Sequence, residues 1–90
     1  MHLALFYDYV PEVLERRKPF REAHLALVRK LHAEGRIVIA GAFQPVDGAL
    51  LVFRVDGPAE VEAFVKADPY AQNGLVRSWR VREWTVVVGG

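Results

Sequence analysis

The sequence predicts an α+β domain whose elements follow one another in the order β-α-β-β-α-β. Two segments with helical spacing of apolar residues are separated by a pair of apolar strands, and a further strand lies at each end. Turn residues, "VDG" and "DGP", stand on either side of the third strand. A chain of 90 residues has room for a single domain, here 1–90, with one hydrophobic core.

The first half of the chain contains one strand and the main helix. The strand is predicted over 3–9, "LALFYDY", which is rich in aromatic and aliphatic residues and ends before Pro11. The stretch "VPEVLERRKP" contains two prolines and is expected to form a loop or a short helical turn. The main helix is predicted from about Pro19 to Glu34, because proline suits a first helical turn and Gly35 suits a helix end.

The second half supplies the remaining elements. Strands are predicted over 36–42, 49–55 and 75–88, with a helix over 58–67 and a polar connection, "DPYAQNG", before the last strand. Two helices separated by a hairpin, with a strand at each end, make the split-βαβ or ferredoxin-like arrangement. This arrangement predicts a four-stranded antiparallel sheet with both helices on one face.

Two strand sequences also indicate what covers the other face of the sheet. A strand covered on one face alternates apolar and polar residues, whereas "ALLVFRV" and "LALFY" are apolar on both faces. Two helices cover one face only, and a monomer rarely exposes an apolar patch of this size. We therefore expect a homodimer in which the sheet faces of two copies pack together around a barrel-like core. An exposed apolar face in a monomer is the less favoured alternative.

The composition excludes several classes of protein. The chain is 52% hydrophobic and 26% charged, with a formal net charge of +1, which is typical of a globular domain and not of a nucleic-acid-binding protein. No apolar run approaches the roughly 20 residues that span a bilayer, so we expect no membrane partner and a cytoplasmic location. The absence of cysteine excludes disulfides, thiolate zinc sites and cysteine nucleophiles.

The main candidate for chemistry is His24, which lies in the middle of the apolar helix face in "FREAHLALVRKL". A lone histidine there is either a core residue with satisfied ring nitrogens or a general base oriented by a carboxylate. Asp8 and Asp68 are the candidate carboxylates. Asp68 has a second explanation, because an aspartate before proline is a good N-cap for a short helix. Capping and orientation of an imidazole are compatible, since a carboxylate has two oxygens.

Further residues are candidates for binding a ligand. Tyr7 and Tyr70 are amphipathic and suit a pocket wall, Arg17 and Arg21 suit an anionic substrate, and Gly41 allows a ligand close to the backbone. Each also has a plain structural explanation: a half-buried sheet edge, a solvated helix face, or the end of a strand. The three histidines lack metal-binding spacing, and no glycine pattern matches a phosphate or dinucleotide loop, so we expect no metal and no cofactor.

Several segments in this order and spacing resemble the YCII-related (YciI-like) family. They are "LERRKPFREAHL", "LHAEGRIVIAGAF", the short "DG" hairpin and above all "FVKADPYAQNGLV", which together extend over nearly the whole chain. The resemblance implies a ferredoxin-like fold, dimers formed through the sheets, and a His-Asp pair proposed as a catalytic dyad. The family histidine matches His24, its Asp-Pro-Tyr matches residues 68–70, and its basic positions match Arg17 and Arg21. The resemblance therefore selects Asp68 over Asp8.

The chain also departs from the family pattern at two places. Many members have Gly-Pro where this chain has Gly41-Ala42, and Gly-Ser where it has Gly48-Ala49. If that serine makes a polar contact in the pocket, this protein lacks the contact and its substrate differs. One branch of the family removes hydrogen chloride from a chlorinated muconolactone-type compound, which makes lyase chemistry an expectation here.

Two functions from different classes follow. The first is a small cofactor-free enzyme, in which His24, oriented by Asp68, acts as general base on a small organic acid or lactone, by elimination or by hydrolysis. The second is a non-catalytic dimeric module that binds a small molecule, with the two residues as a structural pair. Open space beside the free ring nitrogen favours the enzyme, and a closed site favours the module. An oxygen-using monooxygenase is a third possibility with no sequence feature of its own.

Overall fold

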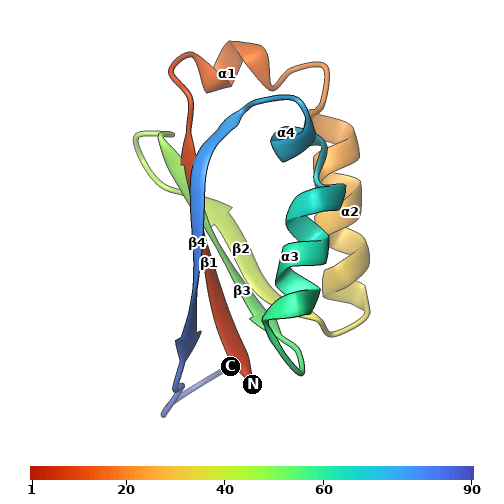
Figure 1. Cartoon of the computed structure of the whole chain (residues 1–90), viewed down its shortest axis with the longest axis vertical. Helices are drawn as coiled ribbons and strands as arrows, with labels where there is room; N and C mark the ends of the chain where they lie inside the picture. Colours follow the sequence, from red (N-terminus) through yellow and green to blue (C-terminus); the bar gives the residue numbers. More distant parts are fainter.

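A four-stranded antiparallel sheet in the order β2-β3-β1-β4 carries helices on one of its faces (Figure 1). The structure is a computed structural model that describes residues 1–90. The strands are β1 (His2–Tyr9), β2 (Ile37–Ala42), β3 (Gly48–Arg54) and β4 (Val76–Trp84). The helices are α1 (Val13–Arg16), α2 (Arg21–Ala33), α3 (Pro58–Ala67) and α4 (Pro69–Gln72). The predicted ferredoxin-like α+β fold is confirmed, with α2 and α3 both on the same face of the sheet (Figure 1).

The prediction was wrong about the length of the last strand. Residues 75–88 were expected to be extended, but β4 ends at Trp84, which pairs with His2. The sequence "TVVV" that follows has high strand propensity. However, β1 begins at His2, so no residues of the neighbouring strand remain for 85–88 to pair with. The tail turns back instead, and the carbonyl of Gly90 accepts a hydrogen bond from Arg54.

The core lies between the sheet and the helices. On β1 the residues that face the helices alternate with the others, and they are Leu3, Leu5, Tyr7 and Tyr9, all buried. Their neighbours on β3 follow the same alternation, since Leu5 pairs with Leu51. The predicted inner face of α3, which comprises Val61, Phe64 and Val65, is buried against this layer. Every second residue of the strands and every third or fourth residue of the helix thus face the same apolar layer, as the periods of 2 and 3.6 require.

The hairpin between β2 and β3 depends on a glycine. Gly48 begins β3 opposite Asp8, and a Cβ atom at this position would overlap the carbonyl oxygen of Tyr7. The close approach of the two backbones therefore excludes any larger residue without a backbone shift.

The opposite face of the sheet is apolar at its centre and carries no helix. The alternation of β1 and β3 places Phe6, Leu50 and Val52 on this outer face. Ile39 on β2 is 66% exposed and Trp84 on β4 is 49% exposed. The guanidinium of Arg80 lies 4.5 Å from the centre of the Phe6 ring and covers part of the face.

No helix in the structure is long and apolar enough to cross a membrane. The cytoplasmic location stays a prediction.

We predict that Leu5→Ala lowers the free energy of unfolding by about 2 to 5 kcal/mol, because it opens a cavity at a fully buried position of a central strand. Urea unfolding followed by circular dichroism measures the loss. The matched control is Leu14→Ala, at a side chain that is 51% exposed on α1, for which we expect a change within about 0.5 kcal/mol. Equal losses in the two variants would contradict this placement of the core.

Candidate active site

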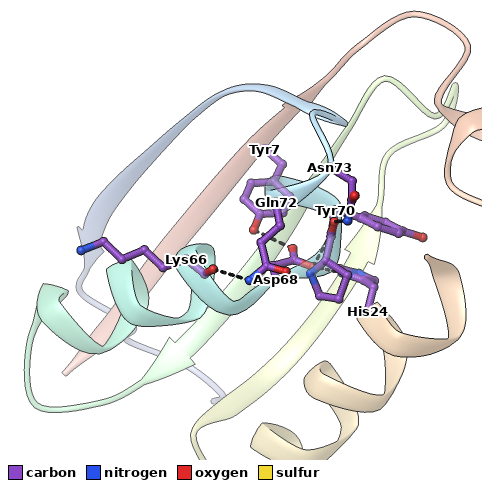
Figure 2. A network of polar contacts seen from close by, with 8 residues as sticks. Tyr7, His24, Lys66, Asp68, Tyr70, Gln72 and Asn73 are labelled. Carbon is purple, nitrogen blue, oxygen red and sulfur yellow. Dashed lines mark hydrogen bonds and ion pairs between the residues drawn. The ribbon is translucent and has the colours of Figure 1, made fainter.

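The junction between α3 and α4 places a carboxylate inside the protein. Asp68 is the residue between the two helices, in an extended conformation with φ −71° and ψ 119°, and its side chain is completely buried. The helix ends here because the residue before a proline disfavours the helical conformation. Side chains of the next turn hold the junction: Gln72 donates to the Lys66 carbonyl at 2.9 Å and Asn73 donates to the Pro69 carbonyl at 2.7 Å (Figure 2).

Three donors satisfy this buried carboxylate (Figure 2). The hydroxyl of Tyr7 donates to Oδ2 at 2.7 Å. Oδ1 lies 2.7 Å from Nδ1 of His24 and also accepts the backbone N–H of Tyr70 at 3.1 Å. Asp68 is thus both the N-cap of α4 and the partner of the imidazole, and a single oxygen serves both roles. Burial of a carboxylate is costly without donors, and these three offset that cost.

The contact with Asp68 determines the orientation of the His24 ring. A carboxylate accepts a hydrogen from Nδ1, so the second ring nitrogen, Nε2, is the one available to act as a base. Nε2 makes no hydrogen bond within the protein, and His24 lies in the wall of a cavity. The Tyr70 ring stacks on the imidazole with centroids 3.8 Å apart and planes within 3° of parallel. The hydrogen bond and the stacking together hold the ring in one position.

The cavity beside His24 has a volume of about 250 Å³. This is close to the lower end of the range for small-molecule sites, about 300 to 1,000 Å³. Its wall is formed by the end of β1, the α1–α2 connection, α2, the edge strand β2, the β2–β3 connection, β3 and α4. The lining residues are Tyr9, Arg17, Arg21, His24, Leu25, Val28, Ala40, Gly41, Ala42, Gln44, Val46, Ala49, Leu51 and Tyr70.

Most of the predicted ligand-binding residues meet in this wall. Arg17, Arg21, Gly41 and Tyr70 line the cavity together with His24. A Cβ atom on Gly41 would meet nothing within 4 Å, so packing alone does not require glycine there.

Two other candidates lie elsewhere. Tyr7, which was predicted to contact substrate, is 1% exposed and lies outside the cavity lining, because its hydroxyl is bound to Asp68. It supports the site from the core side. Asp8, the rival carboxylate for His24, is exposed and accepts a hydrogen bond from Ser78 at 2.8 Å.

Tyr9 lines the cavity although it was not among the residues predicted from the sequence. Tyr9 lies two residues after Tyr7 on β1, so both rings are on the same face of the sheet. The period-2 spacing of a strand could therefore have predicted that Tyr9 lies near the site. Its ring lies 6.1 Å from that of Tyr70, centre to centre, and edge-on at 77°. No local pattern indicated Gln44 or Val46, which reach the cavity from the β2–β3 connection.

Burial controls the ionisation of two tyrosines at the site. Loss of solvent raises the pKa of Tyr7, and the neighbouring Asp68 carboxylate, which accepts its hydrogen bond, raises it further. Burial likewise raises the pKa of Tyr9, with smaller contributions from Tyr70 and Asp68, while the Arg17 and Arg21 guanidiniums act in the opposite direction. Both hydroxyls therefore stay protonated at neutral pH and serve as hydrogen-bond donors. No group of three or more His, Asp or Glu side chains is arranged to hold a metal ion.

We predict that stability declines above about pH 10, where the tyrosines of the unfolded chain ionise. The folded-state pKa of Tyr7 is raised, so its contribution is complete below pH 10 and is lost as the pH rises further. Tyr7→Phe removes this contribution. The decline in the free energy of unfolding above about pH 10.5 should become shallower by up to about 1.4 kcal/mol per pH unit, as measured in urea. Leu5→Ala is the control, because it destabilises the fold but keeps every tyrosine. Equal slopes in Tyr7→Phe and the unmodified protein would contradict the prediction.

The chain is similar to known proteins over most of its length. The model of the YCII-related domain family matches residues 1–85. Protein YciI of Escherichia coli O6:H1 is 31% identical over 84 residues, covering 82% of this chain and 86% of that protein. An uncharacterised protein of Haemophilus influenzae is 27% identical over 85 residues, covering 83% and 87%. Among solved structures, 5-chloro-2-hydroxyhydroquinone dehydrochlorinase (TftG) of Burkholderia phenoliruptrix AC1100, in complex with 2,5-dihydroxybenzoquinone, has a TM-score of 0.83 and 26% identity, with 94% of each chain covered. The chain belongs to the YCII-related domain family.

Proposed function

We propose that this protein is a small enzyme that uses His24 as a general base, without a cofactor, on a small organic molecule bound in the cavity. One observation carries the proposal: Nδ1 of His24 is held by a buried carboxylate at 2.7 Å, while the unpartnered Nε2 belongs to a residue of the cavity wall. A general base needs this combination of a fixed tautomer and access to substrate. A purely structural pair has no need of an adjoining cavity.

Elimination is the reaction class that the comparisons favour. The solved structure with a TM-score of 0.83 is that of a dehydrochlorinase, an enzyme that removes the elements of hydrogen chloride from its substrate. In such a step Nε2 of His24 takes a proton from the substrate, the electron pair left behind forms a new double bond, and chloride departs. The imidazolium that forms is stabilised by the Asp68 carboxylate and then returns its proton to water. Atoms and charge balance without an oxidant or reductant.

The substrate is proposed only as a class, a small organic acid or acidic ring compound. Ala42 and Ala49, the two positions that depart from the family pattern, pair across β2 and β3 and both line the cavity. The resemblance therefore implies that this part of the wall lacks the hydroxyl that many relatives carry at position 49. A different choice of substrate within the same chemistry is consistent with this change.

The proposal is tested by chloride release from 5-chloro-2-hydroxyhydroquinone, together with a panel of small lactones and halogenated acids. We expect His24→Gln to lower kcat/KM by about 10²- to 10⁴-fold, the usual contribution of a general base. Asp68→Asn keeps the shape but not the charge and should also lower kcat/KM. His32→Gln is the matched control, since His32 is an exposed histidine on the same helix. Full activity in His24→Gln would exclude the proposed base.

A protein that only binds a small molecule, without catalysis, would give different results in the same experiments. Ligands would bind in the cavity, none of the panel would be turned over, and His24→Gln would change stability more than affinity. Modification of His24 by diethylpyrocarbonate, followed by mass spectrometry, adds a test that needs no substrate. An accessible Nε2 is modified and is protected by a bound ligand, whereas a closed structural pair is unreactive.

We further propose that two copies associate through the outer face of the sheet. Phe6, Leu50 and Val52 make the centre of this face apolar, and Ile39 and Trp84 extend it at 66% and 49% exposure. A second copy presents the same surface, so an arrangement with twofold symmetry covers both faces at once.

Light scattering after gel filtration tests this association. We expect twice the chain mass of 10.2 kDa for the unmodified protein and a single chain mass for Leu50→Glu, which places a charge at the centre of the interface. Leu14→Glu, on the exposed surface of α1, should remain dimeric. A single chain mass for the unmodified protein at about 100 μM would exclude the proposed interface.

A further inference from the structure

One buried polar atom in the wall of the cavity has no partner. The hydroxyl of Tyr70 makes no hydrogen bond within the protein, although the residue is only 2% exposed. Buried polar side-chain atoms are almost always hydrogen-bonded, so each exception calls for an explanation. The other such atom in the chain is Nε2 of His2, which is not part of this cavity.

The other roles of Tyr70 do not explain its hydroxyl. The ring stacks on His24, and the backbone N–H donates to Asp68. A phenylalanine ring and backbone would serve both purposes. The hydroxyl points away from the Asp68 carboxylate, at the far end of the ring (Figure 2). The hydroxyl is therefore a hydrogen-bond donor without a partner on a residue of the cavity wall. This is expected of a group that donates to a bound ligand.

The polar groups of the same cavity wall favour a negatively charged ligand atom. Tyr9 contributes a second phenol, and Arg17 and Arg21 contribute two cations to the same wall. Neither arginine takes part in any ion pair of the chain. Both guanidiniums act to lower the pKa of Tyr9, against the larger effect of burial. The only carboxylate at the site is that of Asp68, and its two oxygens are already occupied by three donors.

We infer that Tyr9, Tyr70, Arg17 and Arg21 form an oxyanion subsite, which binds a deprotonated oxygen of the ligand and so places an adjoining atom at Nε2 of His24. This inference deepens the proposed function, because it concerns the same cavity, but anion binding does not depend on turnover. The ligand class is a small molecule with an anionic oxygen, either a carboxylate or an acidic ring hydroxyl. Hydrogen bonds from phenol and guanidinium groups to a charged oxygen are shorter and stronger than those between neutral groups. They are stronger still in a cavity shielded from water.

Isothermal titration calorimetry with three probes tests the subsite. Benzoate and benzamide have nearly the same shape and differ in charge, and 2,5-dihydroxybenzoquinone presents acidic ring hydroxyls. We expect at least one of the two acidic probes to bind about tenfold or more tightly than benzamide, as charged hydrogen bonds predict. Tighter binding of benzoate identifies a carboxylate as the preferred source of the oxygen, and tighter binding of the quinone identifies a ring hydroxyl. Equal affinities for all three probes, or no binding of any, would overturn the inference.

Variants separate the subsite from the fold and from catalysis. Tyr70→Phe should weaken binding of the preferred acidic probe about tenfold without lowering the unfolding midpoint, because it removes an unsatisfied hydroxyl. Arg21→Gln should also weaken that probe, whereas Lys30→Gln, an exposed cation on the same helix, should not. Unchanged affinity in Tyr70→Phe would overturn the subsite even if the enzyme turns over substrate. Conversely, selective anion binding without any turnover would leave the subsite in place and exclude the proposed catalysis.

Discussion

The carboxylate of Asp68 is the constraint on which the candidate site depends. It is fully buried, and its donors come from three separate parts of the chain: Tyr7 on β1, His24 on α2, and the backbone of Tyr70 on α4. Loss of any one of them leaves a buried charge incompletely satisfied, which is costly in a low-dielectric interior. The carboxylate therefore links the sheet to both helical segments. Apolar packing of the same volume would stabilise the interior at least as well as a buried, hydrogen-bonded carboxylate.

The three tyrosines of the protein have different roles around this group. Tyr7 lies on the core side of Asp68 and fixes the carboxylate through its hydroxyl. Tyr70 lies on the cavity side, where its ring stacks on the imidazole and its hydroxyl has no partner. Tyr9 continues the inner face of β1 from the core into the cavity wall. A path of hydrogen bonds thus runs from Tyr7 in the core through Asp68 to His24.

The two faces of the sheet differ in what covers them. The inner face carries the core and the site, and the outer face is apolar without a covering helix. Arg80 covers part of Phe6, whereas Ile39 and Trp84 are left 66% and 49% exposed. A fold of this size buries a limited share of its surface, so a second copy on the outer face would add to a core that is small in the single chain.

The sequence by itself determined the order of the elements, because hydrophobic period and turn residues are local properties. It also determined that His24 lies on the apolar face of its helix and that the central strands are apolar on both sides. For Asp68 it offered capping of a short helix as one of two explanations, and the structure shows that the same carboxylate does both. The sequence could not choose between Asp8 and Asp68 as the partner of His24; residue patterns left both open, and only family resemblance preferred one.

The tertiary structure decided the rest, since the contacts that matter join residues 44 and 61 positions apart. It placed Tyr7 behind the carboxylate and Tyr9 in the cavity wall, although both lie on the same face of one strand. It also ended β4 at Trp84, because pairing needs a partner strand and propensity alone does not provide one. Local sequence fixes which way a side chain points within its element, whereas the packing of several elements determines what that side chain meets.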